Sequence, residues 1–317
     1  MDMGIDDAMA LAYAVGNPQV EILGVTGTYG NVYMEQGVRN AQMILRLLGE
    51  YDIPVLGGLS HALCKEKFDR LPVSAAIHGE DGIGNVSGRL GRLLEKQEKE
   101  SMEAVDFILR NAELYKESLI VVTTGPLTNI AEALRRNPEV MKMAGGIVMM
   151  GGALTVNGNV TVSAEANIYQ DPQAAKEVFE SGIQVTMTGL DVTMRSVLGK
   201  EQTEEWRSTG SEAGILFADM TEYYISQHTS VEKLFGKCYL HDPSAVICAV
   251  HPEWFRKLDL FMTVLTDGEC AGRTVGVSNR IREKHPNVHV CIQADSEKVI
   301  QEFNNTLIDL FSNGRKK

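Results

Sequence analysis

The segment Ser118–Arg136 has the sequence SLIVVTTGPLTNIAEALRR, and it decides the fold class. Its first part, Ser118–Thr124, is rich in β-branched residues and predicts a buried strand. Pro126 suits the first turn of a helix, and Leu127–Arg136 has the apolar spacing of one. A strand that turns directly into a helix is the repeating unit of a parallel sheet covered by helices. The segment therefore predicts an α/β fold.

The same alternation continues along the chain in both directions. Further helices are predicted at Asp7–Val15, Gln36–Leu48, Glu212–Gln227 and Ser296–Ser312. Further strands are predicted at Val20–Thr28, Gly146–Met150 and Gln184–Leu190, and three that look antiparallel at Leu258–Thr266, Thr274–Val277 and His289–Gln293. Because no repeat, low-complexity segment or linker divides the chain, we predict one domain over residues 1–317. Its core is expected to be an open, mostly parallel sheet flanked by helices.

Charge and cysteine content limit the expected partners and compartment. The net charge of −12 at pH 7 would repel nucleic acid and anionic membranes, so we expect neither as a partner. The five cysteines are scattered and form no CxxC pair, which favours a reducing cytosol over a disulfide framework. No apolar stretch approaches the roughly 18 residues of a membrane span, and no leader peptide is visible. We therefore expect a cytoplasmic protein.

Three aspartates, Asp2, Asp6 and Asp7, crowd a glycine-containing turn where the first helix is expected. One aspartate at such a place commonly caps the helix and favours its dipole. Three together raise one another's pKa unless a cation holds them ionised. An oxygen-only cluster selects a hard ion such as calcium or magnesium. The cluster predicts either a helix cap or a cation site.

The tripeptide His241-Asp242-Pro243 precedes an apolar helix that is predicted at Ser244–Val250. One interpretation is an Asp N-cap with proline at the first helical position, which the tripeptide alone favours. The other is a further carboxylate ligand beside a histidine that acts as a general acid.

Two further segments carry groups that suit a sugar and a metal ion. Asn159, Glu165 and Asn167 are turn formers in one interpretation, and in the other they hydrogen-bond to vicinal hydroxyls. Thr124 stands at a strand end that turns into a helix, where a backbone carbonyl is exposed and can ligate a cation.

Seven segments together resemble the nucleoside hydrolase family, which includes inosine-uridine-preferring and ribonucleoside-preferring enzymes. They stand in family order and at family spacing over essentially the whole chain. They are DMGIDDA (2–8), GNV (30–32), HGEDGIGN (78–85), TGPLTNIA (124–131), MGGA (150–153), GNVTVSAEANIYQDP (158–172) and HDP (241–243).

The resemblance implies an open α/β sheet with a Rossmann-like core, in homodimers or homotetramers. It implies calcium-dependent hydrolysis of the N-glycosidic bond of purine or pyrimidine ribonucleosides, giving ribose and a free base for salvage. The implied calcium ligands are Asp2, Asp7, Asp242 and the carbonyl of Thr124, completed by a water and the ribose 2′- and 3′-hydroxyls. The implied ribose contacts are Asp6 at the 2′-hydroxyl, Asn167 at the 3′-hydroxyl, Asn159 and Glu165 at the 5′-hydroxyl, and Asn31 beside the ribose and the metal. Asp2 would also be the general base that takes a proton from the water.

The leaving base must be protonated or stabilised, and two histidines are candidates. His241 is the first, because it adjoins a metal ligand, and His78 in the HGEDG segment is the second. The remaining histidines are expected to be structural or on the surface: His61, His228, His251, His285 and His289.

The start of the chain departs from the family pattern, in which a strand ends in Asp-x-Asp-x-Gly. This chain begins Met1-Asp2-Met3-Gly4, so the family's first strand and first aspartate are missing. We expect a slot in the sheet with unpaired backbone groups, and Asp2 on a free terminus. Weakened calcium binding and reduced activity are expected as a result.

Two other functions remain open at this point. One is a nucleoside- or ribose-binding protein of the same fold with little catalysis. The other is a magnesium-dependent phosphotransferase, which the absence of a GxxxxGK loop disfavours. Release of free base, binding without turnover, or release of phosphate distinguishes the three.

Overall fold

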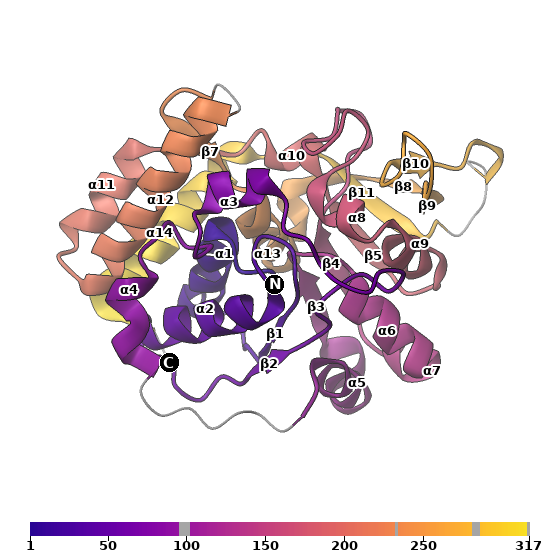
Figure 1. Cartoon of the computed structure of the whole chain (residues 1–317), viewed down its shortest axis with the longest axis horizontal. Coiled ribbons are helices and arrows are strands. Elements are labelled where there is room, and N and C mark those ends of the chain that lie inside the picture. The colour runs from indigo at the N-terminus through magenta and orange to yellow at the C-terminus, as the bar shows by residue number, and fades with distance from the viewer. Residues whose placement is uncertain (95–101, 232–233, 281–285, 316–317) are drawn as a thin grey trace.

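The computed structural model describes residues 1–94, 102–231, 234–280 and 286–315, and a central sheet runs through it (Figure 1). The sheet has the strand order β3-β4-β5-β11-β8. Its strands are β3 (Ile120–Thr123), β4 (Gly146–Met150), β5 (Val185–Thr188), β11 (Val288–Ala294) and β8 (Phe255–Leu260). All neighbours pair in parallel except β8, which is antiparallel to β11 at the edge. The mostly parallel sheet predicted from the sequence is confirmed.

Helices cover both faces of this sheet, and β4 shows why. Successive side chains of a strand point to opposite faces, so Ile147 and Met149 join one hydrophobic core while Val148 and Met150 join the other. The first core is closed by α5 (Ala104–Tyr115), α6 (Thr128–Arg136) and α9 (Pro172–Glu180). The second is closed by α1 (Ile5–Gly16), α13 (His241–Val250) and α14 (Ser296–Asn313), on the opposite side in Figure 1.

Short sheets and helices surround this centre. The paired strands are β1 (Val25–Gly27) with β2 (Val55–Gly57), β6 (Val197–Gly199) with β7 (Lys237–Tyr239), and β9 (Met262–Val264) with β10 (Thr274–Gly276). The remaining α-helices are α2 (Met34–Leu47), α3 (Pro72–His78), α4 (Ser87–Leu90), α7 (Pro138–Met141), α8 (Ala166–Gln170), α10 (Leu190–Thr193), α11 (Lys200–Ser208) and α12 (Glu212–Val231). Single 3-10 turns occupy Gly91–Leu94, Lys116–Ser118, Pro252–Trp254 and Ser278–Arg280. None of the helices in the described ranges is both long and apolar enough to cross a bilayer.

The predicted elements differ from the observed ones mainly in the strands. The predicted strand Val20–Thr28 is reduced to Val25–Gly27, because its partner β2 begins only after Pro54, which has no N–H to donate. The predicted strand Leu258–Thr266 is divided between β8 and β9. The strand predicted at His289–Gln293 looked antiparallel, yet β11 pairs in parallel with β5 and antiparallel only with β8.

A groove of about 570 Å³ is lined by β1 and β3, which are not neighbours in any sheet. The expected slot is therefore present. The expectation that Asp2 sits on a loose terminus is wrong, since Asp2 is fully buried. The Met1 ammonium donates to the Thr26 carbonyl at 2.9 Å, and the Thr28 N–H donates to the Met1 carbonyl at 2.9 Å. These two bonds tie the first residue to β1.

Phe303 of α14 tests the contribution of the second core to stability. Its ring is fully buried, with the rings of Tyr13 and Trp206 at 6.2 Å and 6.0 Å between centroids. Phe303→Ala is expected to lower the free energy of unfolding by about 3–5 kcal/mol in a urea titration, since it removes a buried aromatic and leaves a cavity. The control Leu114→Ala, at a 65% exposed position, should change it by less than about 0.5 kcal/mol. A loss below about 1 kcal/mol for Phe303→Ala would contradict this view of the core.

Candidate active site and metal centre

A pocket of about 230 Å³ lies where β3 and β4 end and α1 and α13 begin. Open α/β sheets hold ligands at such carboxyl ends of their strands. The predicted site residues that line it are Asp6, Asn31, His78, Thr124, Asn159, Glu165, Asn167, His241 and Asp242. The others that line it are Val73, Ser74, Ile77, Met150, Val160, Ala166, Tyr224 and His228. Segments that are far apart in the sequence, between Asp6 and Asp242, therefore meet in one cavity.

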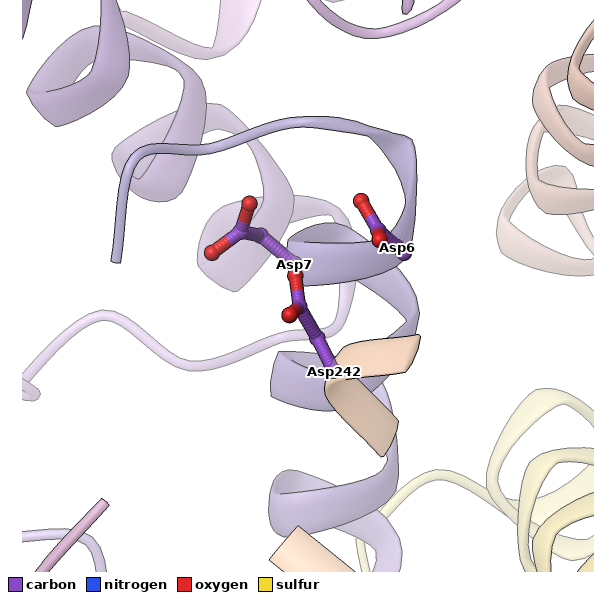
Figure 2. A group of neighbouring side chains, drawn as sticks. All are labelled: Asp6, Asp7 and Asp242. Carbon is purple, nitrogen blue, oxygen red and sulfur yellow. The ribbon is translucent and has the colours of Figure 1, made fainter. Parts of the chain in front are cut away.

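Three buried carboxylates form a compact group beside this pocket. One oxygen each of Asp6, Asp7 and Asp242 lies within 4.8 Å of the other two. Figure 2 shows Asp6 and Asp7 on the first turn of α1, and Asp242 at the start of α13 with its carboxylate directed at Asp7. Asp2, which the family resemblance implies as a ligand, is outside this group of three but lies against Asp7. The observed group thus joins Asp7 and Asp242 of the implied ligand set with Asp6, which was expected to contact the ribose.

Asp7 is the centre of the cluster and also caps its helix. It accepts hydrogen bonds from the Gly4 N–H at 2.8 Å and the Thr124 hydroxyl at 2.6 Å. The Oδ2 of Asp6 accepts from the Tyr224 hydroxyl at 3.2 Å, and backbone N–H groups of the first turn also favour its ionised form. Asp242 is no cap, because Leu240 holds the N-cap position and the HDP tripeptide is the first turn of α13 itself. The capping interpretation therefore holds for Asp7.

Asp2 is held by the loop that follows β1. The backbone N–H of Asn31 donates to Asp2 Oδ2 at 2.7 Å, and the side-chain amide donates to Oδ1 at 3.3 Å. Gly30 has a φ of +155°, and a Cβ there would stand 1.9 Å from Asp2 Oδ2. Only glycine fits this close approach of backbone to carboxylate.

Burial and mutual repulsion favour the protonated form of these acids. Burial, and then the charge of Asp7, raises the pKa of Asp2 well above its usual value and that of Asp6 to about 7. Burial, and then the charges of Asp6, Asp7 and Asp2, raises the pKa of Asp242 strongly. Asp6 Oδ1 and Asp242 Oδ2 are buried with no hydrogen-bond partner among the described residues. An all-oxygen donor set with unused lone pairs fits a hard divalent cation.

The segment expected to bind the sugar also has structural bonds. Glu165 caps α8 by accepting from the Asn167 N–H at 2.9 Å and the Ile168 N–H at 3.2 Å. Asn159 accepts from the Ala166 N–H at 3.0 Å. Asn167 donates to the Thr124 carbonyl at 3.4 Å, which places that carbonyl at the pocket. These side chains are therefore fixed in position while they line the cavity.

His78 and His241 are both held at Nδ1. His78 Nδ1 accepts the Ile5 N–H at 3.1 Å, and burial lowers the pKa of His78 to about 3, so its ring is neutral with the proton on Nε2. Its 3.8 Å approach to Asp6 is therefore not an ion pair. His241 Nδ1 is bonded to the Thr193 hydroxyl at 2.8 Å.

His228, which was expected to be structural or on the surface, lies at the pocket. It is buried, lines the pocket, and meets the Tyr224 ring edge-on at 4.3 Å. Tyr224 and His228 are four residues apart on α12, a spacing that puts both on one face of a helix and could have indicated their shared position. His61, His251 and His289 do not line this pocket, and His285 lies outside the described residues.

The comparisons with known proteins agree on one family. The family model described as inosine-uridine preferring nucleoside hydrolase matches residues 1–301. The chain belongs to the nucleoside hydrolase family. It is thus an N-glycosidase, and the fold and resemblance inferred from the sequence are confirmed.

Proteins similar to this nucleoside hydrolase carry names that indicate different base preferences. It is 34% identical over 299 residues to a pyrimidine-specific ribonucleoside hydrolase of Escherichia coli O9:H4 (strain HS), covering 93% of both chains. It is 35% identical over 274 residues to uridine nucleosidase 1 of Arabidopsis thaliana, covering 86% of this chain and 79% of that one. The solved purine-preferring ribonucleoside hydrolase from Gardnerella vaginalis is 44% identical, with a TM-score of 0.93 and 98% of both chains covered.

The raised pKa of Asp6 predicts that, without metal, the free energy of unfolding of this nucleoside hydrolase falls as the pH rises. A carboxyl with a pKa of about 7 in the folded state and 3.8 as its ordinary value stabilises the fold fully below about pH 4. That stability is lost as the pH rises through about 7. In chelator, Asp6→Asn should therefore gain stability over the parent protein between pH 4 and pH 8, as measured by urea titrations at each pH. Asp106→Asn, at an exposed carboxylate, is the control and should show no such gain. If the free energies of unfolding of Asp6→Asn and the parent differed by the same amount at every pH, the raised pKa of Asp6 would be contradicted.

Proposed function

We propose that this nucleoside hydrolase cleaves the N-glycosidic bond of ribonucleosides in a calcium-dependent reaction. The observation that carries the proposal is the pocket in which buried carboxylates, asparagine amides and three histidines meet. A water would add to the anomeric carbon, and the bond electrons would leave with the base. The products are ribose and a free base.

Asp2, Asp7, Asp242 and the Thr124 carbonyl are the proposed calcium ligands. The donor chemistry supports a cation, because Asp242 keeps an unpartnered buried oxygen among the described residues and the pKa of both Asp2 and Asp242 is raised. Several carboxylates with a backbone carbonyl suit calcium, which takes six to eight oxygens. When bound, the ion keeps these carboxylates ionised and makes a nearby water more acidic.

Asp2 is the proposed general base. Its Oδ2 and Oδ1 are anchored by Asn31, so the carboxylate has a fixed orientation from which to take a proton. Asp6 is proposed to accept from the 2′-hydroxyl and Asn167 to contact the 3′-hydroxyl. Asn159 and Glu165 are proposed to hold the 5′-hydroxyl. Aligned contacts of this kind stabilise an oxocarbenium-like transition state.

His241 is the proposed acid that protonates the leaving base. It lines the pocket and directly precedes Asp242 in the chain, which supports a position near the proposed cation and the leaving base. His78 is the second histidine, and its neutral ring can donate a hydrogen bond from Nε2. A single well-placed proton donor contributes about 10²–10⁴-fold to such reactions.

We propose that purine ribonucleosides are the better substrates. The support is the 44% identity to the purine-preferring hydrolase of Gardnerella vaginalis, against 34% to the pyrimidine-specific one of Escherichia coli. The single domain, a homodimer or homotetramer, and a cytoplasmic location remain predictions from the sequence.

The test is an assay of inosine, adenosine, uridine and cytidine for free base and reducing sugar. We expect turnover that chelator abolishes and calcium restores, with higher kcat/KM for the purines. Turnover that chelator leaves unchanged would contradict the proposed dependence on calcium. A higher kcat/KM for uridine and cytidine would contradict the proposed preference for purine ribonucleosides. Binding without turnover would favour a nucleoside-binding protein, and phosphate release from a phosphoester would favour a phosphotransferase.

Asp2→Asn tests the proposed base. The amide keeps the shape of the side chain but cannot take a proton and ligates a cation poorly, so kcat on inosine should fall by about 10³-fold or more. Initial rates at saturating calcium measure this, with Asp106→Asn as the control that should retain parental activity. A rate within about tenfold of the parent would remove Asp2 from the mechanism.

A further inference from the structure

The short helix α10 lies beside His241 of the pocket and carries two buried polar side chains. Thr193 is fully buried, and its hydroxyl is 2.8 Å from Nδ1 of His241. Asp191 is also buried and accepts from the Leu154 N–H at 2.9 Å and the Thr155 N–H at 2.7 Å. The Leu190 N–H donates to the Gly152 carbonyl at 2.9 Å. The hydroxyl of Thr193 is thus presented from a firmly bonded element.

The bond to Thr193 determines which nitrogen of His241 is available for chemistry. The two ring nitrogens of imidazole point in diverging directions, so a ring held at Nδ1 presents Nε2 elsewhere. His241 borders the pocket, and its ring is further confined by Tyr239 at 5.3 Å between centroids. With Nδ1 bonded to Thr193, a proton transfer from the ring to the leaving base would use Nε2.

We propose that Thr193 is a positioning residue that orients His241 so that Nε2 delivers its proton to the leaving base, an inference that rests on the proposed function. The step balances as follows. Water adds a hydroxyl to the anomeric carbon and gives its proton to Asp2, while the electron pair of the carbon–nitrogen bond leaves with the base. The base takes the Nε2 proton of the His241 imidazolium.

A hydroxyl suits this position because it needs no rearrangement during the step. Before the transfer Nδ1–H donates to the Thr193 oxygen, and after it the neutral ring still carries Nδ1–H and donates to the same oxygen. A methyl group in place of the hydroxyl would leave the buried Nδ1 without this partner and release the ring.

Two substrates with the same sugar distinguish positioning from general damage. Inosine needs a proton on its leaving base, whereas 4-nitrophenyl β-D-ribofuranoside releases a nitrophenolate that is stable without one. For Thr193→Val we expect kcat on inosine to fall by about 10–100-fold, a part of what a general acid contributes. KM for inosine and kcat/KM for the nitrophenyl riboside should stay within about threefold of the parent protein.

Three variants complete the experiment. Thr193→Ser keeps the hydroxyl and should restore kcat on inosine to within about threefold of the parent. Thr203→Val removes a buried threonine hydroxyl of α11 outside the pocket and should change neither substrate. In a His241→Ala background, Thr193→Val should have no further effect on inosine, because the residue acts through that ring.

The outcomes separate this inference from the proposed function. Equal losses on both substrates, no loss on inosine, or failure of serine to rescue would each overturn the role of Thr193. If the valine variant does not fold, Thr193→Ala carries the same two-substrate comparison. A parent protein that cleaves neither substrate with calcium present would overturn the proposed function itself, and with it this inference.

Discussion

Buried carboxylates at the start of α1 and α13 impose the main constraint on this structure. Asp2, Asp6, Asp7 and Asp242 are almost inaccessible to water, so their repulsion is poorly screened. The two helices offset part of this cost, because both direct the positive ends of their dipoles at the cluster. Hydrogen bonds offset more of it at Asp7 than at Asp6 or Asp242. The arrangement therefore favours bound protons or a bound cation, and the competition between them couples pH to metal affinity.

The chain around the cluster resists the relaxation that this repulsion would otherwise cause. Met3 has a φ of +42°, uncommon for a residue with a side chain, and its side chain is fully buried in the core beside α1. Strained backbone of this kind persists only where the surroundings determine it, and it concentrates at functional sites. Asn31 adds side-chain and backbone bonds to Asp2 from a different segment. Core packing therefore stabilises a group of charges that would separate in a less rigid structure.

The sequence pattern predicted those helices and strands whose conformation depends on neighbouring residues. It did not predict strand lengths and side-chain positions that depend on strand pairing or on contacts with distant residues. Gly146–Met150 was predicted residue for residue, because an apolar β-branched run buried on both faces has no other stable conformation here. The length of β1 depends on Pro54, which is remote in sequence. The family resemblance brought the motif residues together in one expected site. The burial of Asp2 by Met1 and Asn31 could not be predicted from the sequence, and neither could the position of His228, since both depend on tertiary contacts.

Under the proposed function, the helix α10 connects the side of the pocket that would hold the sugar with the side that would hold the base. A helix of four residues has little stability of its own, so its position depends on its tertiary bonds. Asp191 ties it to the start of the segment that carries Asn159 and Glu165 on the sugar side. Thr193 ties it to His241 on the base side. A shift of this one element would move contacts to both parts of a ribonucleoside together. If the sugar and the base bind as proposed, their orientation and protonation would be coupled through backbone and side-chain bonds that do not touch the substrate.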